Sequence, residues 1–143
     1  MIKKTLFAAA VLLSLIICAT AGCTNKADSG KNKVPADGIY EIAVTLSGGT
    51  GKASVESPAR LTVREGRMTA RLVWSSKNYD YMLVGEQRID ARIIDGHSVF
   101  EIPAAALDTD LSVTADTTAM SVPHEIVYTL RFDSATLKAV EEP

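Results

Sequence analysis

The chain has 143 residues, with 15 Lys and Arg against 17 Asp and Glu, so its formal net charge is −2 at pH 7. From Asp37 to the C-terminus the balance is more acidic, with ten basic and sixteen acidic side chains. An acidic surface repels phosphate backbones, so this composition argues against nucleic acid as a partner.

The first residues have the pattern of an exported bacterial lipoprotein. Two lysines precede an apolar run from Leu6 to Ile17, which is short for a membrane span. The sequence TAGC that follows ends at Cys23 and is typical of the lipobox before which signal peptidase II cuts. We therefore predict a signal peptide over residues 1–22 and acylation, with palmitate, at Cys23. The alternative is an ordinary secretory signal that contains a chance cysteine.

A mature chain that starts at Cys23 contains no other cysteine, which excludes a disulfide, a thiolate metal site and a cysteine nucleophile. Residues 23–36 are polar and read as a flexible tether that links an extracytoplasmic membrane surface to one domain over residues 37–143. The tether lysines, Lys26, Lys31 and Lys33, either contact anionic lipid headgroups or belong to a plain disordered linker.

Short runs of alternating apolar and polar residues follow one another through the domain, separated by turn residues. The expected strands are 40–46, 59–63, 68–74, 79–83, 89–94, 100–102, 111–115 and 126–132, with one helical turn over 104–107. The turn at Glu65 and Gly66 makes a hairpin of the second and third strands. This spacing predicts an all-β fold, an antiparallel β-sandwich or barrel of seven or eight strands.

Sequence motifs for catalysis do not occur in the chain. The segment SGGTGKAS, residues 47–54, differs from a phosphate-binding loop because Leu46 stands where that motif needs Gly and Ala53 where it needs Ser or Thr. Two histidines are too few for a histidine-built zinc site unless carboxylates complete it. We therefore expect a binding protein and not an enzyme.

From Gly38 to Asp133 the chain resembles a NEAT domain, the immunoglobulin-like haem-binding module of Gram-positive iron uptake. The segments that carry the resemblance are YEIAVTL at 40–46, SVESPARLTVREGRMTARLVW at 54–74, FEIP at 100–103 and YTLRFD at 128–133. The resemblance implies an immunoglobulin-like β-sandwich with haem as cofactor. The predicted lipid anchor suits either a Gram-positive membrane face or a Gram-negative envelope leaflet, and the resemblance favours the Gram-positive surface. It also implies a haem donor and ABC-transporter components as partners.

The resemblance places an iron site on the last strand. In the family this strand carries Tyr-x-x-x-Tyr, of which the first Tyr ligates ferric iron and the second hydrogen-bonds to it. Residues four apart on a strand share a face. Here His124 stands at the first position and Tyr128 at the second, and imidazole is also an axial ligand of haem iron. The alternative for His124 is a surface or capping histidine beside Pro123.

Three further residues belong to the implied haem site. Ser54 and Lys52 lie in the segment that corresponds to the opposing lip of the family's pocket, where they would contact haem propionates, although the family's Tyr is missing there. Met120 has a thioether that can ligate haem iron. Its alternative role is that of a flexible packing residue under a loop.

An aromatic cluster supports a second function. Trp74, Tyr79 and Tyr81 lie in the segment WSSKNYDY together with Asn and Asp, a composition that suits stacking on a sugar ring. The same residues can instead fill the core and flank a connection. Three functions thus remain open: haem binding for uptake, an adhesion or carbohydrate-binding module, and a protein-interaction domain of the envelope.

Overall fold

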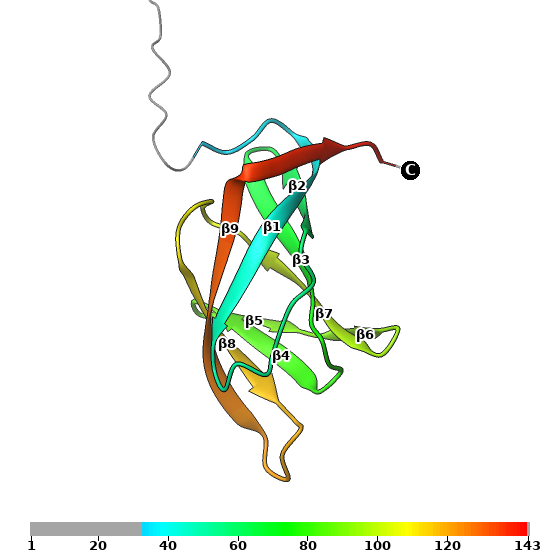
Figure 1. The fold of residues 1–143 in the computed structure, drawn as a ribbon, viewed down its shortest axis with the longest axis vertical. Coiled ribbons are helices and arrows are strands. Elements are labelled where there is room, and N and C mark those ends of the chain that lie inside the picture. The colour runs from blue at the N-terminus through cyan, green and yellow to red at the C-terminus, as the bar shows by residue number, and fades with distance from the viewer. Residues whose placement is uncertain (1–32, 143) are drawn as a thin grey trace, which may run out of the picture.

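The computed structural model describes residues 33–142, so the predicted signal peptide, Cys23 and most of the tether lie outside the described residues. The described elements are all strands: β1 (Gly38–Gly48), β2 (Ala59–Arg64), β3 (Arg67–Val73), β4 (Tyr79–Val84), β5 (Gln87–Asp90), β6 (Arg92–Ile94), β7 (His97–Pro103), β8 (Leu111–Thr117) and β9 (His124–Val140). The all-β prediction is confirmed (Figure 1). Within this part of the chain, no helix is long and apolar enough to cross a membrane.

Three expectations about the elements are wrong in detail. The run 89–94 forms two strands because Ala91 leaves the ladder and donates its N–H to the carbonyl of Asp80 at 2.8 Å, which raises the strand count to nine. The helical turn over 104–107 does not form, since the N–H of Ala104 bonds to the carbonyl of Met68 at 3.0 Å. The last strand continues to Val140, well past residue 132.

The strands form one antiparallel sheet in the order β5-β4-β8-β9-β1-β2-β3-β7-β6. Ser98 on β7 draws the two ends of this sheet together. Its buried hydroxyl donates to the carbonyl of Tyr79 on β4 at 2.6 Å and accepts the N–H of Tyr79 at 3.2 Å. The sheet therefore wraps around itself into two facing layers, with a single core between them (Figure 1).

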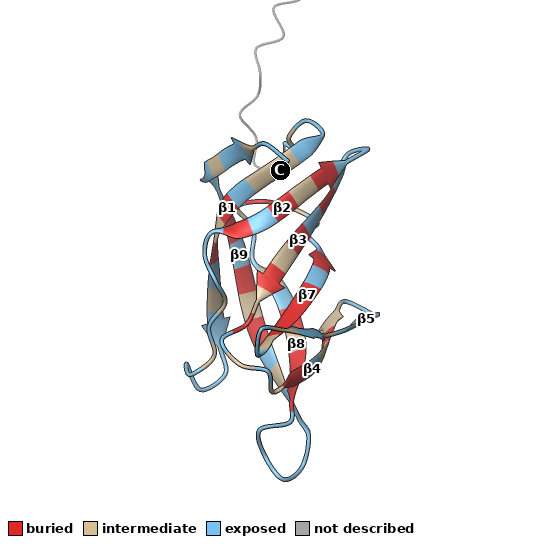
Figure 2. Cartoon of the chain, turned by 90° about the vertical axis from the view of Figure 1, so that its right-hand side faces the viewer, coloured by how far each residue is buried: buried red, intermediate tan, exposed pale blue. Residues whose placement is uncertain are grey.

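Alternation along the strands decides which side chains enter the core (Figure 2). On β2, Leu61 and Val63 are fully buried, whereas Arg60 before them and Arg64 after them are exposed. The largest fully buried side chains are Trp74, Phe100, Phe132, Ile42, Leu61, Leu72, Met82, Ile102 and Leu130. Burial of each such side chain contributes roughly 1.5–3 kcal/mol, so this cluster is the main source of stability.

The two ends of the domain carry different features. The loop between β8 and β9 projects beyond the sandwich at one end, while the chain enters from the tether at the other (Figure 1). The entry is fixed by two hydrogen bonds: Tyr40 Oη donates to the carbonyl of Ala36 at 2.8 Å, and Asp37 accepts the N–H of Glu65 at 3.0 Å. The predicted site residues His124 and Met120 therefore lie far from the tether.

Candidate functional site

His124 and Tyr128 share the inward face of β9 but differ in surroundings. On the neighbouring strand β8, Thr117 lies opposite His124 and Val113 opposite Tyr128. Tyr128 is 2% exposed, whereas His124 stands at the start of the strand and is exposed. No hydrogen bond or ion pair joins the imidazole to any residue that the structure describes. Both ring nitrogens of His124 are therefore available to a ligand.

Tyr128 packs in the core and forms its hydrogen bond there, not with His124. Its Oη lies 3.3 Å from the Oη of Tyr79, and its ring meets the edge of Trp74 with centroids 5.2 Å apart. Burial raises the pKa of Tyr128, and the hydrogen bond with Tyr79 raises it further. Tyr128 consequently stays a neutral phenol, and the hydrogen bond to the first position of the motif is not made.

The connection between β1 and β2 covers this tyrosine. A Cβ built on Gly49 would lie 2.8 Å from a ring carbon of Tyr128, closer than real Cβ atoms come, and 3.1 Å from the Cγ2 of Ile126, which is also tight. The φ of Gly49 is +58°, which also favours glycine. The segment that resembled a phosphate loop thus serves as a close-packed cover over Tyr128 and Ile126.

Lys52 and Ser54 lie on the same connection, and both are exposed. Ser54 is held by its backbone, since its N–H donates to Ser75 Oγ at 3.3 Å and its carbonyl accepts the N–H of Ser75 at 2.9 Å. Neither side chain contacts His124 through a hydrogen bond in the described part of the chain. The predicted lip therefore lies beside the covered Tyr128, but its polar groups remain free toward solvent.

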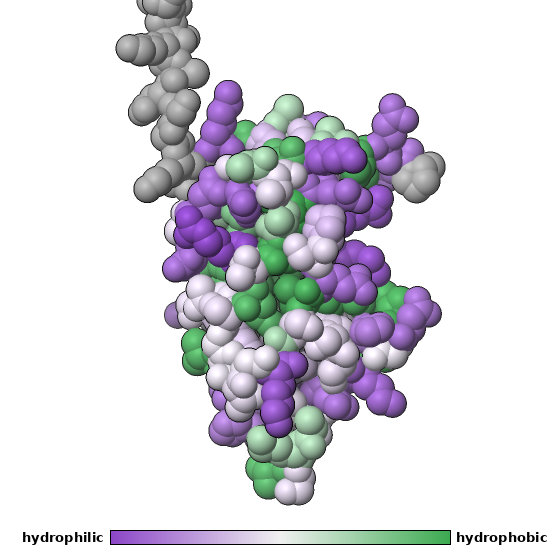
Figure 3. All heavy atoms as spheres, viewed as in Figure 1, coloured by the Kyte–Doolittle hydropathy of each residue, from purple (hydrophilic) through white to green (hydrophobic). Residues whose placement is uncertain are grey.

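Met120 lies in the loop between β8 and β9 and is 61% exposed, so its predicted alternative as a packing residue is wrong. Val122 in the same loop is 70% exposed. The end of the molecule that this loop forms is correspondingly hydrophobic (Figure 3). The loop is short and has no described partner strand beyond it, which leaves these side chains without a core to join.

A shallow polar hollow of about 720 Å³ lies next to His124, and sequence analysis did not find it. Its lining residues are Asp80, Tyr81, Arg88, Asp116, Pro123, His124 and Glu125. A hydrogen bond of 2.6 Å to Glu125 raises the pKa of Tyr81 to about 12. Burial raises the pKa of Asp116, as does a hydrogen bond to Asp80. Tyr81, Asp116 and Glu125 come from three neighbouring strands and lie side by side only because those strands pair. No local sequence pattern therefore predicts the hollow.

The predicted aromatic surface patch is wrong for two of its three members. Trp74 is fully buried and Tyr79 is 9% exposed, with ring centroids 4.3 Å apart, so both are core residues. Tyr81 is partly exposed, but the guanidinium of Arg88 covers its ring at 3.8 Å from the centroid. The three rings cannot form a common platform for a sugar.

Among the residues that the structure describes, no group of three or more His, Cys, Asp or Glu side chains is placed to hold a metal ion. The carboxylates Asp80, Asp116 and Glu125, which line the polar hollow, do not form such a group either. A metal centre made of protein ligands alone is therefore not found on the described domain.

Comparison with known proteins gives structural neighbours. No protein-family model matches the sequence, and no curated protein matches it either. Among solved structures, the NEAT5 domain of IsdX2, a B. anthracis hemophore in complex with heme, is similar with a TM-score of 0.53 and 22% identity, over 68% of this chain and 97% of that one. A mutant of the same NEAT5 domain, also in complex with heme, has a TM-score of 0.54 and 23% identity, over 69% and 97%. This chain therefore has the fold of a NEAT domain, an immunoglobulin-like antiparallel β-sandwich.

Proposed function

We propose that this chain is a lipid-anchored surface protein whose domain binds haem for iron uptake, with His124 as the axial ligand of the iron. The observation that carries the proposal is the exposed imidazole of His124, which has no partner among the described residues and lies on the face of β9 that also carries Tyr128. The NEAT fold supports it, because the two similar solved domains are in complex with heme.

The described domain carries side chains of the types that such a group needs. Bound haem would supply a ferric or ferrous iron, for which the imidazole of His124 is a good donor, and two propionates that would accept hydrogen bonds. The half-buried Ile126 and the exposed Met120 provide apolar surface for a porphyrin face. Lys52 offers an ammonium for a propionate and Ser54 a hydroxyl, both from the connection that covers Tyr128. Tyr128, four residues from His124 on β9, anchors this part of the strand to the core through its hydrogen bond with Tyr79.

The cellular part of the proposal comes from the sequence. Acylation at Cys23, after removal of residues 1–22, would place the domain on the extracytoplasmic face of the membrane of a Gram-positive cell. The partners that fit this position are a haem donor and the components of an ABC transporter. Their binding requires no catalysis by this chain.

A haem titration tests the proposed site. The soluble chain from residue 24 is titrated with haem and followed by absorbance, beside His124→Ala and Met120→Leu. We expect a saturable shift of the Soret band that His124→Ala abolishes and Met120→Leu retains. The reverse pattern would make the thioether the ligand, and a wild-type chain without a saturable shift would contradict haem binding altogether.

A further inference from the structure

The tether joins the domain at the turn between β2 and β3. The carboxylate of Asp37 accepts the N–H of Glu65 in this turn at 3.0 Å, and Val34 lines the same hollow of about 310 Å³ as Arg67. Ten residues separate Cys23 from Lys33, a length that spans at most about 36 Å when fully extended. If Cys23 carries the lipid, the turn is therefore the part of the domain that meets the membrane first.

The outer face of the β2–β3 hairpin carries four arginines at directly opposed positions. Arg60 lies opposite Arg71, and Arg64 lies opposite Arg67. None of the four forms an ion pair with a described residue, whereas three other arginines of the domain each pair with a carboxylate at 2.7–3.1 Å. Like charges opposed across a strand pair repel each other, so this face gains from binding an anion.

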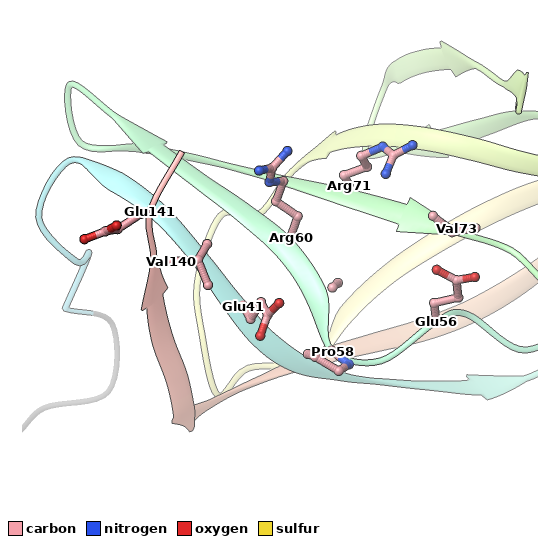
Figure 4. Close-up of a pocket in the computed structure, with 9 residues that line it drawn as sticks. Glu41, Glu56, Pro58, Arg60, Arg71, Val73, Val140 and Glu141 are labelled. Carbon is pink, nitrogen blue, oxygen red and sulfur yellow. The ribbon is translucent and has the colours of Figure 1, made fainter. Parts of the chain in front are cut away.

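The two opposed pairs have different surroundings. Arg60 and Arg71 extend on the same side of neighbouring strands, beside a hollow of about 380 Å³ (Figure 4). The acidic residues that line this hollow are Glu41, Glu56 and Glu141. They balance the charge of that pair. Arg64 and Arg67 stand at the tip of the hairpin, beside the tether, and both are exposed.

The charge at the tip becomes clearly positive only together with the tether. Arg64, Arg67 and Lys33 exceed the acidic Asp37 and Glu65 by one charge, and the rest of the tether, with lysines at 26 and 31 against Asp28, raises the excess to two. The rest of the domain is acidic, so the tip is the exception on its surface. Basic groups next to a lipid anchor are the usual second signal for stable attachment to an anionic leaflet.

We infer that the tip of the β2–β3 hairpin docks on anionic phospholipid headgroups of the membrane that holds the anchor, with Arg64 and Arg67 as its main contacts. The inference rests on the proposed anchoring at Cys23. A guanidinium binds phosphate through paired N–H donors, which makes arginine suited to this contact. Because the tether confines the domain near the bilayer, the effective headgroup concentration is high and a weak contact suffices.

Docking at this tip determines the orientation of the domain. The loop between β8 and β9 lies at the opposite end from the tether (Figure 1). His124 and the exposed Met120 and Val122 would then point away from the membrane, toward molecules that arrive from outside. A domain that merely swings on its tether would instead present all its faces equally.

Energy transfer to labelled lipids tests the orientation. The chain from residue 24, which has no cysteine, carries an N-terminal histidine tag and is held on chelator lipids in phosphatidylcholine vesicles, with or without phosphatidylglycerol. One fluorophore is placed at Ala105→Cys, exposed beside the tip, and another, in a separate sample, at Ser121→Cys in the β8–β9 loop. We expect stronger transfer to labelled headgroups from position 105 than from 121, and only with phosphatidylglycerol.

Paired variants make the test specific. Arg64→Gln with Arg67→Gln should remove the difference between the two positions, as should high salt, which screens exposed charges. Arg88→Gln with Arg92→Gln changes the net charge equally at arginines that already have carboxylate partners, and it should retain the difference.

Three results would overturn the inference. They are equal transfer from the two positions, transfer that ignores phosphatidylglycerol, and an equal loss in both paired variants. If the tip bound a soluble anionic wall polymer while the energy transfer did not depend on phosphatidylglycerol, Arg64 and Arg67 would be contacts for that polymer and not for the membrane. Chelation holds the chain on the vesicle, so the outcome depends neither on acylation of Cys23, which mass measurement tests separately, nor on haem binding.

Discussion

The hydroxyl of Tyr79 lies 3.3 Å from the hydroxyl of Tyr128, inside the core and below the glycine cover of the β1–β2 connection. The pair joins β4 to β9, strands that are not neighbours in the sheet. It also explains why only His124 of the His-x-x-x-Tyr motif is accessible: Tyr128 already has a partner, and burial raises its pKa. The two motif residues thus differ in their surroundings: His124 is open to solvent, and Tyr128 is part of the core.

Tyr128→Phe tests this division. The change leaves the Tyr79 hydroxyl nearly buried without its partner, which we expect to cost about 1–2 kcal/mol of unfolding free energy. Haem affinity should change far less than in His124→Ala. Urea unfolding followed by the fluorescence of Trp74, which packs against both tyrosines, measures the first effect. Haem titration measures the second.

The double variant Tyr79→Phe with Tyr128→Phe is the control for that experiment. Removal of both hydroxyls leaves no unpaired group, so its stability should lie closer to wild type than that of Tyr128→Phe. A double variant that loses the sum of the two single effects would show that the hydroxyls do not interact.

Gly49→Ala tests the cover over Tyr128. The new Cβ would lie 2.8 Å from the tyrosine ring, and the positive φ of +58° adds backbone strain. Gly51→Ala is a matched control, because its φ is +75° but nothing lies within 4 Å of the new Cβ. We expect a loss of about 1 kcal/mol from strain in Gly51→Ala and about 1–3 kcal/mol more in Gly49→Ala, from overpacking, by urea unfolding. Equal losses would mean that the connection moves freely off Tyr128.

Ser98→Ala tests how the sheet closes. The buried hydroxyl satisfies both the N–H and the carbonyl of Tyr79, and its loss leaves two backbone groups without a partner. We expect a cost of about 1–3 kcal/mol, measured by urea unfolding, and faster amide exchange at Tyr79. Ser112→Ala on the exposed face of β8 should change stability little. If the two variants behaved alike, the ends of the sheet would not depend on Ser98.

Local patterns were enough to predict most strands but not their partners. On β2, alternation correctly places Leu61 and Val63 inside, and the turn at Glu65 and Gly66 is where the sequence predicts it. The extension of β9 beyond residue 132 lacks such alternation. It forms because β1 offers a partner, with Ile39 opposite Val140, which no short window of sequence reveals.

The candidate site shows the same limit. Spacing alone puts His124 and Tyr128 on one face, and the structure agrees. Spacing does not show that the Tyr128 hydroxyl forms a hydrogen bond with Tyr79, 49 residues away in the sequence, or that Gly49 lies against the ring of Tyr128. These contacts join distant segments through the fold, so they carry no periodic signal. The exposure of Met120 was missed for a similar reason, since nothing local says where the core ends.

Asp116 allows a prediction about pH. The residue is 3% exposed, and burial, followed by a hydrogen bond to Asp80, raises the pKa of its carboxyl above the ordinary value of 3.8. A carboxyl whose pKa is higher in the folded state than in the unfolded state favours folding when protonated. Its contribution is therefore fully present below the unfolded pKa and is lost as pH rises through the folded pKa.

Asp116→Asn should consequently stabilise the domain at neutral pH, because it removes the cost of a buried charge next to Asp80. The advantage should shrink as pH falls and vanish below the ordinary pKa of an aspartate, where the wild-type carboxyl is protonated in both states. Urea unfolding at a series of pH values measures it, with Glu86→Gln in an exposed turn as the control for loss of one charge. An advantage that is constant with pH, or equal in Glu86→Gln, would show that the carboxyl of Asp116 is well solvated in the folded domain.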